Sequence, residues 1–118
     1  MESVFVRILD KINFNPKPEK KNSDISEIDL HITEILDDHR GMSNGEILQV
    51  QLDRFTTSLE GASKTDQKKI VFIHGLGNGK LKFEVRKLLN TKYSHLKYQD
   101  ASFKEYGYGA TMVYLKLK

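Results

Sequence analysis

The sequence predicts an α/β domain, a two-layer α+β sandwich with the element order β-α-β-α-β-β. Three observations predict this class: an alternating strand pattern over residues 27–32, an apolar run typical of a buried strand over 69–74, and apolar residues at helical spacing between and after them. A chain of 118 residues can build one such domain, and its core needs no disulfide. The chain has no cysteine, which fits a reducing, cytoplasmic setting.

The front of the chain is expected to lie outside this domain. Residues 1–14 include a short alternating strand, which we assign to the end of a preceding domain in a longer protein. Residues 15–24 hold both prolines among polar and charged side chains, a composition typical of a mobile linker. The folded domain is therefore expected to cover residues 25–118.

Two helices are expected from their start signals and periodicity. Ser43 and Glu46 have capping-box spacing, so the first helix should begin there and end near Gly61. The second helix is expected over 80–91, with Asn78 as its cap. The polar connection before the first helix leaves room for one helical turn.

The last two strands are expected at 96–102 and 110–116. Right-handed crossovers with both helices on one face make the first three strands parallel, and the fourth returns antiparallel. The second and fourth strands are the most apolar, and central strands are the apolar ones. The predicted sheet order is therefore 1-2-4-3.

A glycine-rich turn joins the second strand to the second helix. His74 is followed by Gly75, Gly77 and Gly79, and then by Lys80. Glycines there let backbone N–H groups point outward, and a helix N-terminus adds positive potential, so the turn suits a phosphate. A histidine beside it can exchange protons near neutral pH. The alternative is a tight turn that needs glycine only for its backbone angles.

Charge is distributed unevenly, although the net charge is only +3. Residues 25–63 are strongly acidic, whereas residues 64–118 carry twelve basic and four acidic side chains. A basic half suits polyanions, with an ordinary solvated surface as the alternative. The chain shows no signal peptide and no apolar run of membrane-spanning length, so no membrane partner is expected.

The predicted topology brings chemically active residues to one edge of the sheet. The carboxyl ends of parallel strands lie together, and ligand sites of open α/β sheets lie just beyond them. The first strand supplies Asp29 and His31, the second supplies His74, and the third leads into a loop with aromatic and basic side chains. We expect Asp29, His31 and His74 to lie near enough to share a ligand.

Three segments resemble a known family. Asp29-Leu30-His31, then residues 74–79, then residues 107–115 are similar to the three signatures of the Smr (small MutS-related) domain, and the resemblance covers about residues 27–117. It implies a fold like the C-terminal domain of bacterial translation initiation factor three. It also implies a nucleic-acid partner, DNA or RNA, and in several members nicking of DNA or cleavage of RNA.

The resemblance carries three candidate catalytic residues onto this chain. His74 could act as a general base or steady a leaving oxygen, with His31 as its partner. Asp29 could orient a histidine or hold a metal. The alternatives are a hydrogen-bonded strand end for His74, and solvent-facing side chains for the other two. No cofactor is implied with certainty, and a divalent metal stays open.

The phosphate and base contacts are expected from the glycine turn, the second helix and the last loop. Lysines in the first turn of a helix oppose its dipole, which a visiting anion would offset. Aromatic side chains in the last loop could stack on bases. The candidates are Gly75, Gly77, Gly79, Lys80, Lys82, Arg86, Lys104, Tyr106 and Tyr108.

The chain departs from the family signature beside His31. Ile28 replaces a leucine, and Ile32 stands where the family usually has glycine. Asp37 and Asp38 offer metal-ligand types, but adjacent residues rarely point at one ion. Two hypotheses follow: an endonuclease that hydrolyses DNA or RNA phosphodiesters, and a non-catalytic module that docks a larger protein. The loss of glycine at Ile32 favours the second.

Overall fold

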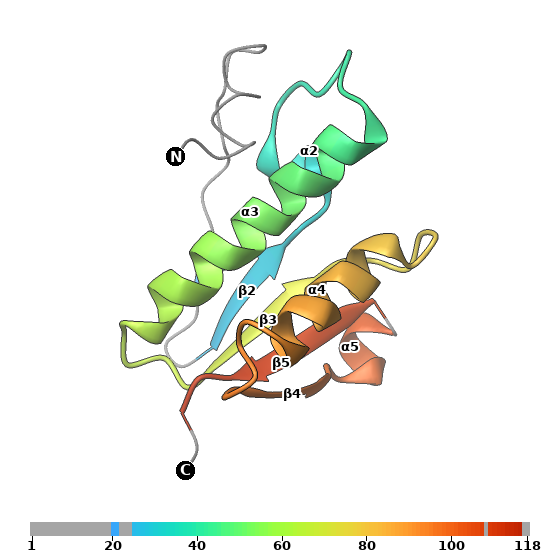
Figure 1. Cartoon of the computed structure of the whole chain (residues 1–118). Helices are drawn as coiled ribbons and strands as arrows, with labels where there is room; N and C mark the ends of the chain where they lie inside the picture. Colours follow the sequence, from blue (N-terminus) through green and yellow to red (C-terminus); the bar gives the residue numbers. More distant parts are fainter. Residues whose placement is uncertain (1–19, 22–24, 108, 117–118) are drawn as a thin grey trace.

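The computed structural model describes residues 20–21, 25–107 and 109–116 (Figure 1). The elements, in chain order, are β1 (Lys20–Lys21), β2 (Ile25–Asp29), α2 (Ile32–Ile35), α3 (Asn44–Ser63), β3 (Lys69–Ile73), α4 (Lys80–Asn90), β4 (Lys97–Asp100), α5 (Phe103–Tyr106) and β5 (Ala110–Tyr114). The predicted order β-α-β-α-β-β corresponds to β2, α3, β3, α4, β4 and β5, so the predicted fold class is confirmed.

One mixed sheet runs through the domain in the order β1-β2-β3-β5-β4. β2 and β3 are parallel, whereas β5 runs antiparallel to both β3 and β4. The four predicted strands therefore lie in the predicted order 1-2-4-3, with the two most apolar strands at the centre. β1 adds a two-residue antiparallel edge beside β2, and the prediction did not include it.

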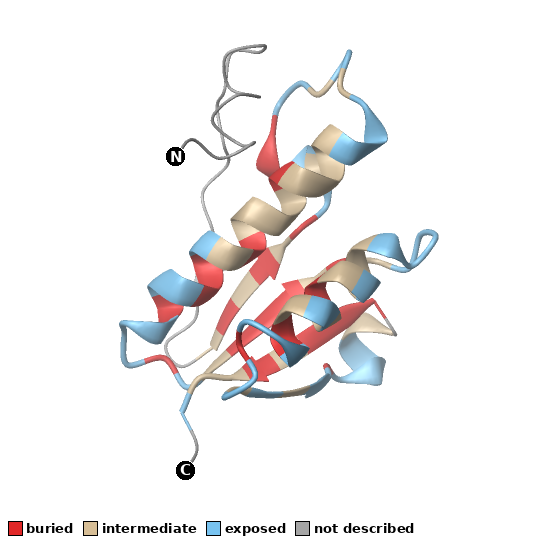
Figure 2. Cartoon of the chain, in the orientation of Figure 1, coloured by how far each residue is buried: buried red, intermediate tan, exposed pale blue. Residues whose placement is uncertain are grey.

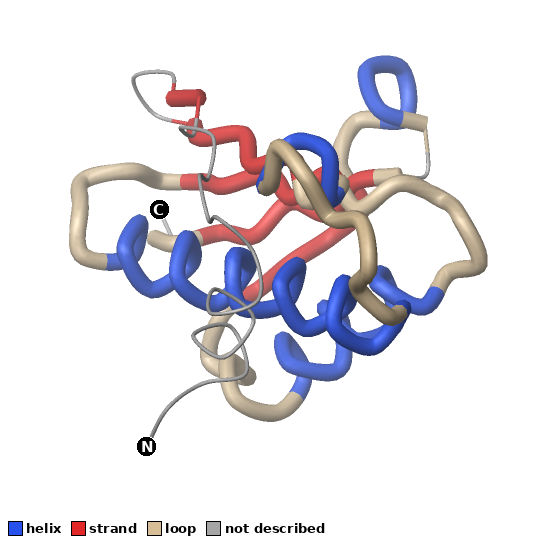
Figure 3. The backbone as a smooth tube through the Cα atoms, turned by 90° about the horizontal axis from the view of Figure 1, so that it is seen from above, coloured by secondary structure: helices blue, strands red, loops and turns tan. Residues whose placement is uncertain are grey.

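The two long helices, α3 and α4, cover the same face of the sheet, as predicted (Figures 1 and 3). The main core lies between these helices and the strands, and Figure 2 shows the buried residues on the surfaces that face each other. At its centre the Phe55 ring of α3 meets the Phe72 ring of β3 edge-on, with ring centroids 4.6 Å apart. Such aromatic pairs add stability beyond the area that they bury.

Helix α3 begins at the predicted capping box. The Ser43 hydroxyl oxygen accepts the backbone N–H of Glu46 at 3.1 Å, and the Glu46 carboxylate accepts the N–H of Ser43 at 3.0 Å. The pair satisfies two N–H groups that the start of a helix would leave without partners. The helix ends at Ser63, slightly beyond the predicted end near Gly61.

Two one-turn helices complete the described fold. α2 occupies the polar connection, where Ile35 and Leu36 are buried with Val50 of α3 in a second apolar cluster. α5 follows β4 where a loop was expected, and its Tyr106 packs against the sheet face opposite the long helices. A single helical turn is too short for apolar periodicity to reveal it in the sequence.

Most of the front of the chain lies outside the described residues. Lys20–Lys21 form β1 within the segment 15–24 that we expected to be a linker. The remainder of that segment, and the strand expected within 1–14, lie outside the described residues. In the described ranges no helix is long and apolar enough to span a membrane.

Candidate nucleic-acid interface

The strands bring the expected site residues to one edge of the sheet. Asp29 at the end of β2 pairs with Ile73 at the end of β3, which pairs in turn with Ala110 at the start of β5. The segments that continue from these positions therefore leave the sheet side by side. His31, the glycine-rich loop and Gly109 meet here, as expected from parallel strands that end together.

Asp29 holds the His31 side chain at this edge. Its Oδ1 atom accepts the backbone N–H of His31 at 2.9 Å and lies 2.6 Å from the imidazole Nδ1. Because a carboxylate only accepts, Nδ1 carries the proton of this bond, and Nε2 of a neutral ring is left as an acceptor. The His31 side chain is 51% exposed. Asp29 therefore fixes the orientation of a ring that stays half exposed.

Gly75 lies directly against that ring nitrogen. A Cβ atom built on Gly75 would stand 2.6 Å from His31 Nε2, which is closer than non-bonded atoms can approach. The backbone of Gly75 also has φ +74°, a left-handed conformation that side chains disfavour. Glycine is therefore favoured at position 75 by the left-handed backbone, and any larger residue would have to displace the His31 ring.

The start of the loop is anchored on β5 through Gly109. The backbone N–H groups of His74 and Gly75 both donate to the Gly109 carbonyl, each at 2.9 Å. A Cβ atom on Gly109 would lie 3.2 Å from the Cα of Gly75, so the two glycines let the backbones approach closely. The end of β3 is thereby fixed to the start of β5.

The rest of the loop turns into α4. Gly77 and Gly79 also have positive φ, +42° and +82°. The N-cap of α4 is Gly79 and not the predicted Asn78, although the Asn78 side-chain oxygen accepts the backbone N–H of Lys80 at 2.9 Å. Leu76 at the loop tip is 62% exposed. The loop therefore presents its glycine backbone and one apolar side chain next to the N-terminus of α4.

His74 differs from His31 in almost every respect. Its residue is only 6% exposed, and both ring nitrogens have partners within the fold. Nδ1 lies 3.0 Å from the Gly75 carbonyl, and Nε2 lies 2.9 Å from the Thr111 hydroxyl. Because a carbonyl only accepts, Nδ1 carries the proton, and Nε2 accepts from Thr111.

Arg86 of α4 completes this buried network. Its Nε and Nη2 atoms donate to the Thr111 hydroxyl at 3.2 and 3.0 Å, which leaves the hydroxyl proton for His74. Burial, together with the positive charges of Lys82 and Arg86, lowers the pKa of His74, although the Gly75 carbonyl and Asp100 oppose the shift. A neutral His74 matches the donors and acceptors around it.

Asp100 at the end of β4 forms ion pairs with Lys82 and Arg86, two of the residues expected to contact phosphate. Its Oδ1 atom lies 2.5 Å from Arg86 Nη2 and 3.8 Å from Lys82 Nζ. The hydrogen bond from Arg86 lowers the pKa of this carboxyl, and the guanidinium also lies 4.9 Å from the centre of the Tyr98 ring. Arg86 therefore joins α4 to both β4 and β5, through Asp100 and Thr111. Lys82 makes only a longer ion pair with Asp100.

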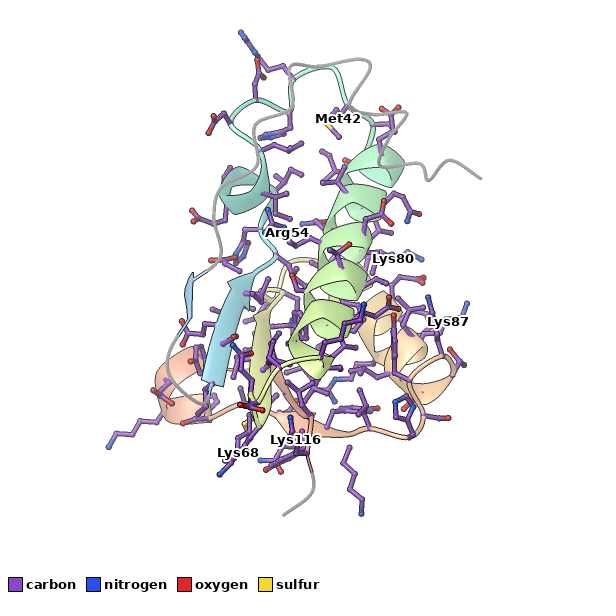
Figure 4. All side chains as sticks on the ribbon, turned by 90° about the vertical axis from the view of Figure 1, so that its left-hand side faces the viewer. Met42, Arg54, Lys68, Lys80, Lys87 and Lys116 are labelled. Carbon is purple, nitrogen blue, oxygen red and sulfur yellow. The ribbon has the colours of Figure 1, made fainter. Side chains whose placement is uncertain are left out.

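The remaining candidates lie at different places on the surface. Lys80 extends from the first turn of α4, where its Nζ atom is 3.2 Å from Glu84 and 5.9 Å from the ring centre of the exposed Phe83 (Figure 4). Lys104 is exposed on α5. Tyr106 donates its hydroxyl hydrogen to Glu27, and burial with this carboxylate raises its pKa. Tyr108 lies outside the described residues.

The acidic loop before α3 has its own pairing. The Asp38 carboxylate accepts from the Arg40 guanidinium at 2.8 Å, and these hydrogen bonds lower the pKa of Asp38 to about 2. Across the described ranges, no three His, Asp or Glu side chains come together as a metal-binding group.

Sequence reasoning missed the partners of His74. Thr111 is fully buried in a strand that is otherwise largely apolar, and Asp100 lies at the end of an exposed edge strand. The small polar side chain of Thr111 within the largely apolar run 110–115 was the available signal, because a buried polar group needs a partner. Sequence alone could not say that this partner was His74.

The fold and this edge define a class of protein: an α/β domain with a glycine-rich loop that leads from strand to helix and is flanked by two histidines. Residues 37–116 match the family model described as Smr domain. The chain therefore belongs to the Smr domain family. The match begins after Asp29 and His31, so these two residues lie just before the matched range.

Two similar proteins are named as the endonuclease MutS2. The chain is 37% identical over 98 residues to MutS2 of Finegoldia magna, covering 82% of this chain and 11% of that protein. It is 39% identical over 66 residues to MutS2 of Aquifex aeolicus, covering 56% of this chain and 8% of that protein. The chain thus spans about a tenth of the length of these relatives.

Replacement of Gly75 by Ala should destabilise the domain and displace His31. The left-handed backbone alone costs a non-glycine residue about 1–3 kcal/mol, and the new methyl group would also overlap the imidazole. Denaturant unfolding gives the loss of stability, and the His31 ring signals in NMR spectra report the displacement.

Gly77→Ala is the matched control, because Gly77 also has positive φ but has no neighbouring atom within 4 Å of an added Cβ. It should lose stability without moving the His31 signals. Equal effects of the two substitutions on His31 would contradict the contact between His31 and Gly75.

The domain should lose stability as the pH falls below about 6.5, because the pKa of His74 is lower in the folded chain than its ordinary value of 6.5. Below that value the unfolded chain binds a proton that the folded chain does not, so the free energy of unfolding decreases. Denaturant unfolding between pH 7.5 and pH 5.5 measures how the free energy of unfolding changes with pH. His74→Gln should reduce this pH dependence, and the exposed control His95→Gln should not. An unchanged slope in His74→Gln would contradict this assignment.

Proposed function

We propose that this chain is a nucleic-acid-binding Smr domain that hydrolyses phosphodiester bonds, with Asp29 and His31 as its acid–base pair. One observation carries the proposal: an exposed imidazole is held on Nδ1 by a carboxylate and lies with Nε2 against a glycine-rich loop. A base oriented by a third group is the arrangement that activates nucleophiles in many unrelated enzymes. The names of the two similar endonucleases support the same reaction class.

The glycine-rich loop is the proposed phosphate contact. Its backbone turns through three glycines with positive φ into the N-terminus of α4, where helix dipole and N–H groups favour an anion. Lys80 adds a mobile positive charge beside it, and Lys82 adds a second. The exposed Leu76 and Phe83 side chains offer apolar contacts to nucleotide bases next to that phosphate.

In the proposed reaction His31 accepts and returns the proton. Its Nε2 atom takes a proton from the attacking water molecule, the water oxygen forms a bond to phosphorus, and the bond from phosphorus to the leaving ester oxygen breaks. The protonated imidazole then returns the proton to the leaving oxygen. Asp29 keeps Nδ1–H in place and stabilises the imidazolium that forms in between.

This assignment reverses the roles that the sequence suggested for the two histidines. His74 is buried, and both of its nitrogens are occupied by Gly75 and Thr111. We therefore propose that His74 positions the loop, and that His31 exchanges protons with the substrate. Both histidines touch Gly75, so a change at either one would reach the same loop.

The alternative is a non-catalytic module that docks a larger protein onto nucleic acid or onto another protein. One observation favours it: Ile32, which replaces the usual glycine of the family signature, begins α2 and packs against the cluster of Ile35, Leu36 and Val50. The chain after His31 therefore takes a course set by this cluster. Since the chain spans about a tenth of its relatives, we also propose that it works beside other domains of a longer protein.

If the domain is an endonuclease, His31→Ala should reduce cleavage about a hundred- to ten-thousandfold, which is the usual contribution of a general acid–base group. Supercoiled plasmid and structured RNA, incubated with and without a divalent ion, provide the assay. Binding should persist in this variant, because the phosphate contacts lie on the loop and on α4.

His95→Ala is the control for that assay, since His95 is another exposed histidine and lies beyond the end of α4. It should cleave like the parent. A His31→Ala protein with parental activity would overturn the acid–base assignment. A parent chain that binds nucleic acid but cleaves nothing would favour the docking module.

Nucleic-acid binding itself should be modest and strongly dependent on salt. Contacts to phosphates without base readout typically give dissociation constants of roughly 10⁻⁴ to 10⁻⁶ M at physiological salt. Lys80→Gln should weaken binding to all sequences alike. It should also reduce the steepness of the plot of log binding constant against log salt concentration, the salt slope, by about one. Titration of labelled DNA and RNA at several salt concentrations measures both quantities.

Lys92→Gln is a closely matched control. The Lys92 side chain is 57% exposed and pairs with Glu60, and the Lys80 side chain is 58% exposed and pairs with Glu84. Lys92 lies at the opposite end of α4, so its loss should leave binding unchanged. Equal losses in both variants would indicate a diffuse charge effect, and binding that ignores salt would contradict a phosphate interface.

A further inference from the structure

A basic groove lies at the end of the sheet opposite the glycine-rich loop, where β3 and β4 begin and β5 ends. Its volume is about 480 Å³. In Figure 4 the labelled Lys68 and Lys116 lie together at this end, away from Lys80 and Lys87 beside α4. The lining residues are Lys68, Lys69, Lys97, Tyr98, Gln99, Tyr114 and Lys116.

A row of three side chains across the sheet forms one wall of the groove. Tyr114 of β5 pairs in register with Lys69 of β3 on one side and with Lys97 of β4 on the other. Paired residues project from the same face, and Lys69 Nζ lies 5.6 Å from the centre of the Tyr114 ring. Lys69 alternates with the core residue Ile70, so this row lies on the face opposite the long helices.

The charge of the groove has no compensation from its own walls. Four lysines line it, and none of the lining residues is acidic. Within the described part of the chain, no carboxylate pairs with these four lysines, and Lys116 donates instead to the Thr65 carbonyl. On α4, by contrast, Lys80 forms an ion pair with Glu84. Lys82 and Arg86 form ion pairs with Asp100.

We infer that this groove binds a segment of single-stranded nucleic acid, with the sugar–phosphate backbone along the lysines and an unpaired base on Tyr114. The inference rests on the proposed function and adds a second contact to it. Lysines alone would suit any phosphate chain. The aromatic ring between two of them favours a single strand, because only an unpaired base can stack on a protein ring.

The position of the groove sets the length of strand that can reach both contacts. His74 is five residues after Lys69, which at about 3.3 Å per strand residue corresponds to about 17 Å. A single strand has to span this distance to reach both contacts. Oligonucleotides shorter than this should engage one contact at a time, and affinity should increase with length until both contacts are filled.

The test is fluorescence anisotropy of the whole chain with labelled single strands and with the matching duplexes. Tyr114→Leu should weaken single-strand binding about five- to a hundredfold, the usual range for one stacked base, and should change duplex binding far less. Tyr114→Phe keeps the ring and should restore binding. The double variant Lys69→Gln with Lys97→Gln should lower the single-strand salt slope by about 1.4, and Lys92→Gln is again the control. Thermal unfolding of each variant verifies that it folds.

The outcomes separate this inference from the proposed function. If Lys80→Gln weakens binding while the groove variants bind like the parent, the groove inference is wrong and the proposed function stands. If Tyr114→Leu weakens duplex and single strand equally, a single-strand groove is likewise ruled out. A parent chain that binds no nucleic acid at low salt overturns both.

Discussion

The candidate site depends on the close approach of two glycine backbones at the edge of the sheet. The N–H groups of His74 and Gly75 share the carbonyl of Gly109, and this fixes where β3 ends and the loop begins. A Cβ atom on Gly109 would lie 3.2 Å from the Cα of Gly75, and a Cβ atom on Gly75 would lie 2.6 Å from His31 Nε2. It turns His74 into the core and leaves the His31 ring lying against the loop backbone. A larger residue at either glycine would separate the parts of the site.

Burial divides the two histidines into different chemical classes. Desolvation and nearby cations lower the pKa of His74, and its ring lies between the loop carbonyl of Gly75 and the Thr111 hydroxyl. His31 has a carboxylate on Nδ1, the Gly75 backbone near Nε2, and a side chain that is half exposed. The same residue type is thus buried with two hydrogen-bond partners in one place and half exposed beside a carboxylate in the other. Arg86 and Asp100 belong to the surroundings of His74, because Arg86 donates to the Thr111 hydroxyl and Asp100 accepts from Arg86.

Local signals in the sequence were enough to predict the fold, but they did not predict how the site residues are arranged. The capping box of α3, the apolar central strands and the glycine turn each depend on neighbours in the chain, so pattern alone predicted them. The burial of His74 depends on Thr111, which is far away in sequence and close only in the folded sheet. The face of the sheet to which a strand residue projects can be predicted from alternation along the sequence. Beyond the end of a strand, the orientation of a side chain depends on its hydrogen-bond partners. The different surroundings of the two histidines therefore emerged only from the structure.

The extent of β2 bears on where this domain can be divided. The family match begins at residue 37, yet β2 precedes it and pairs with β3 along its whole length. Ile28 and Leu30 from this part of the chain are buried in the main core. A fragment that starts at residue 37 would leave β3 as an open sheet edge, with unpaired backbone groups that invite aggregation. The smallest unit that can behave as an independent domain therefore includes the strand before the family match.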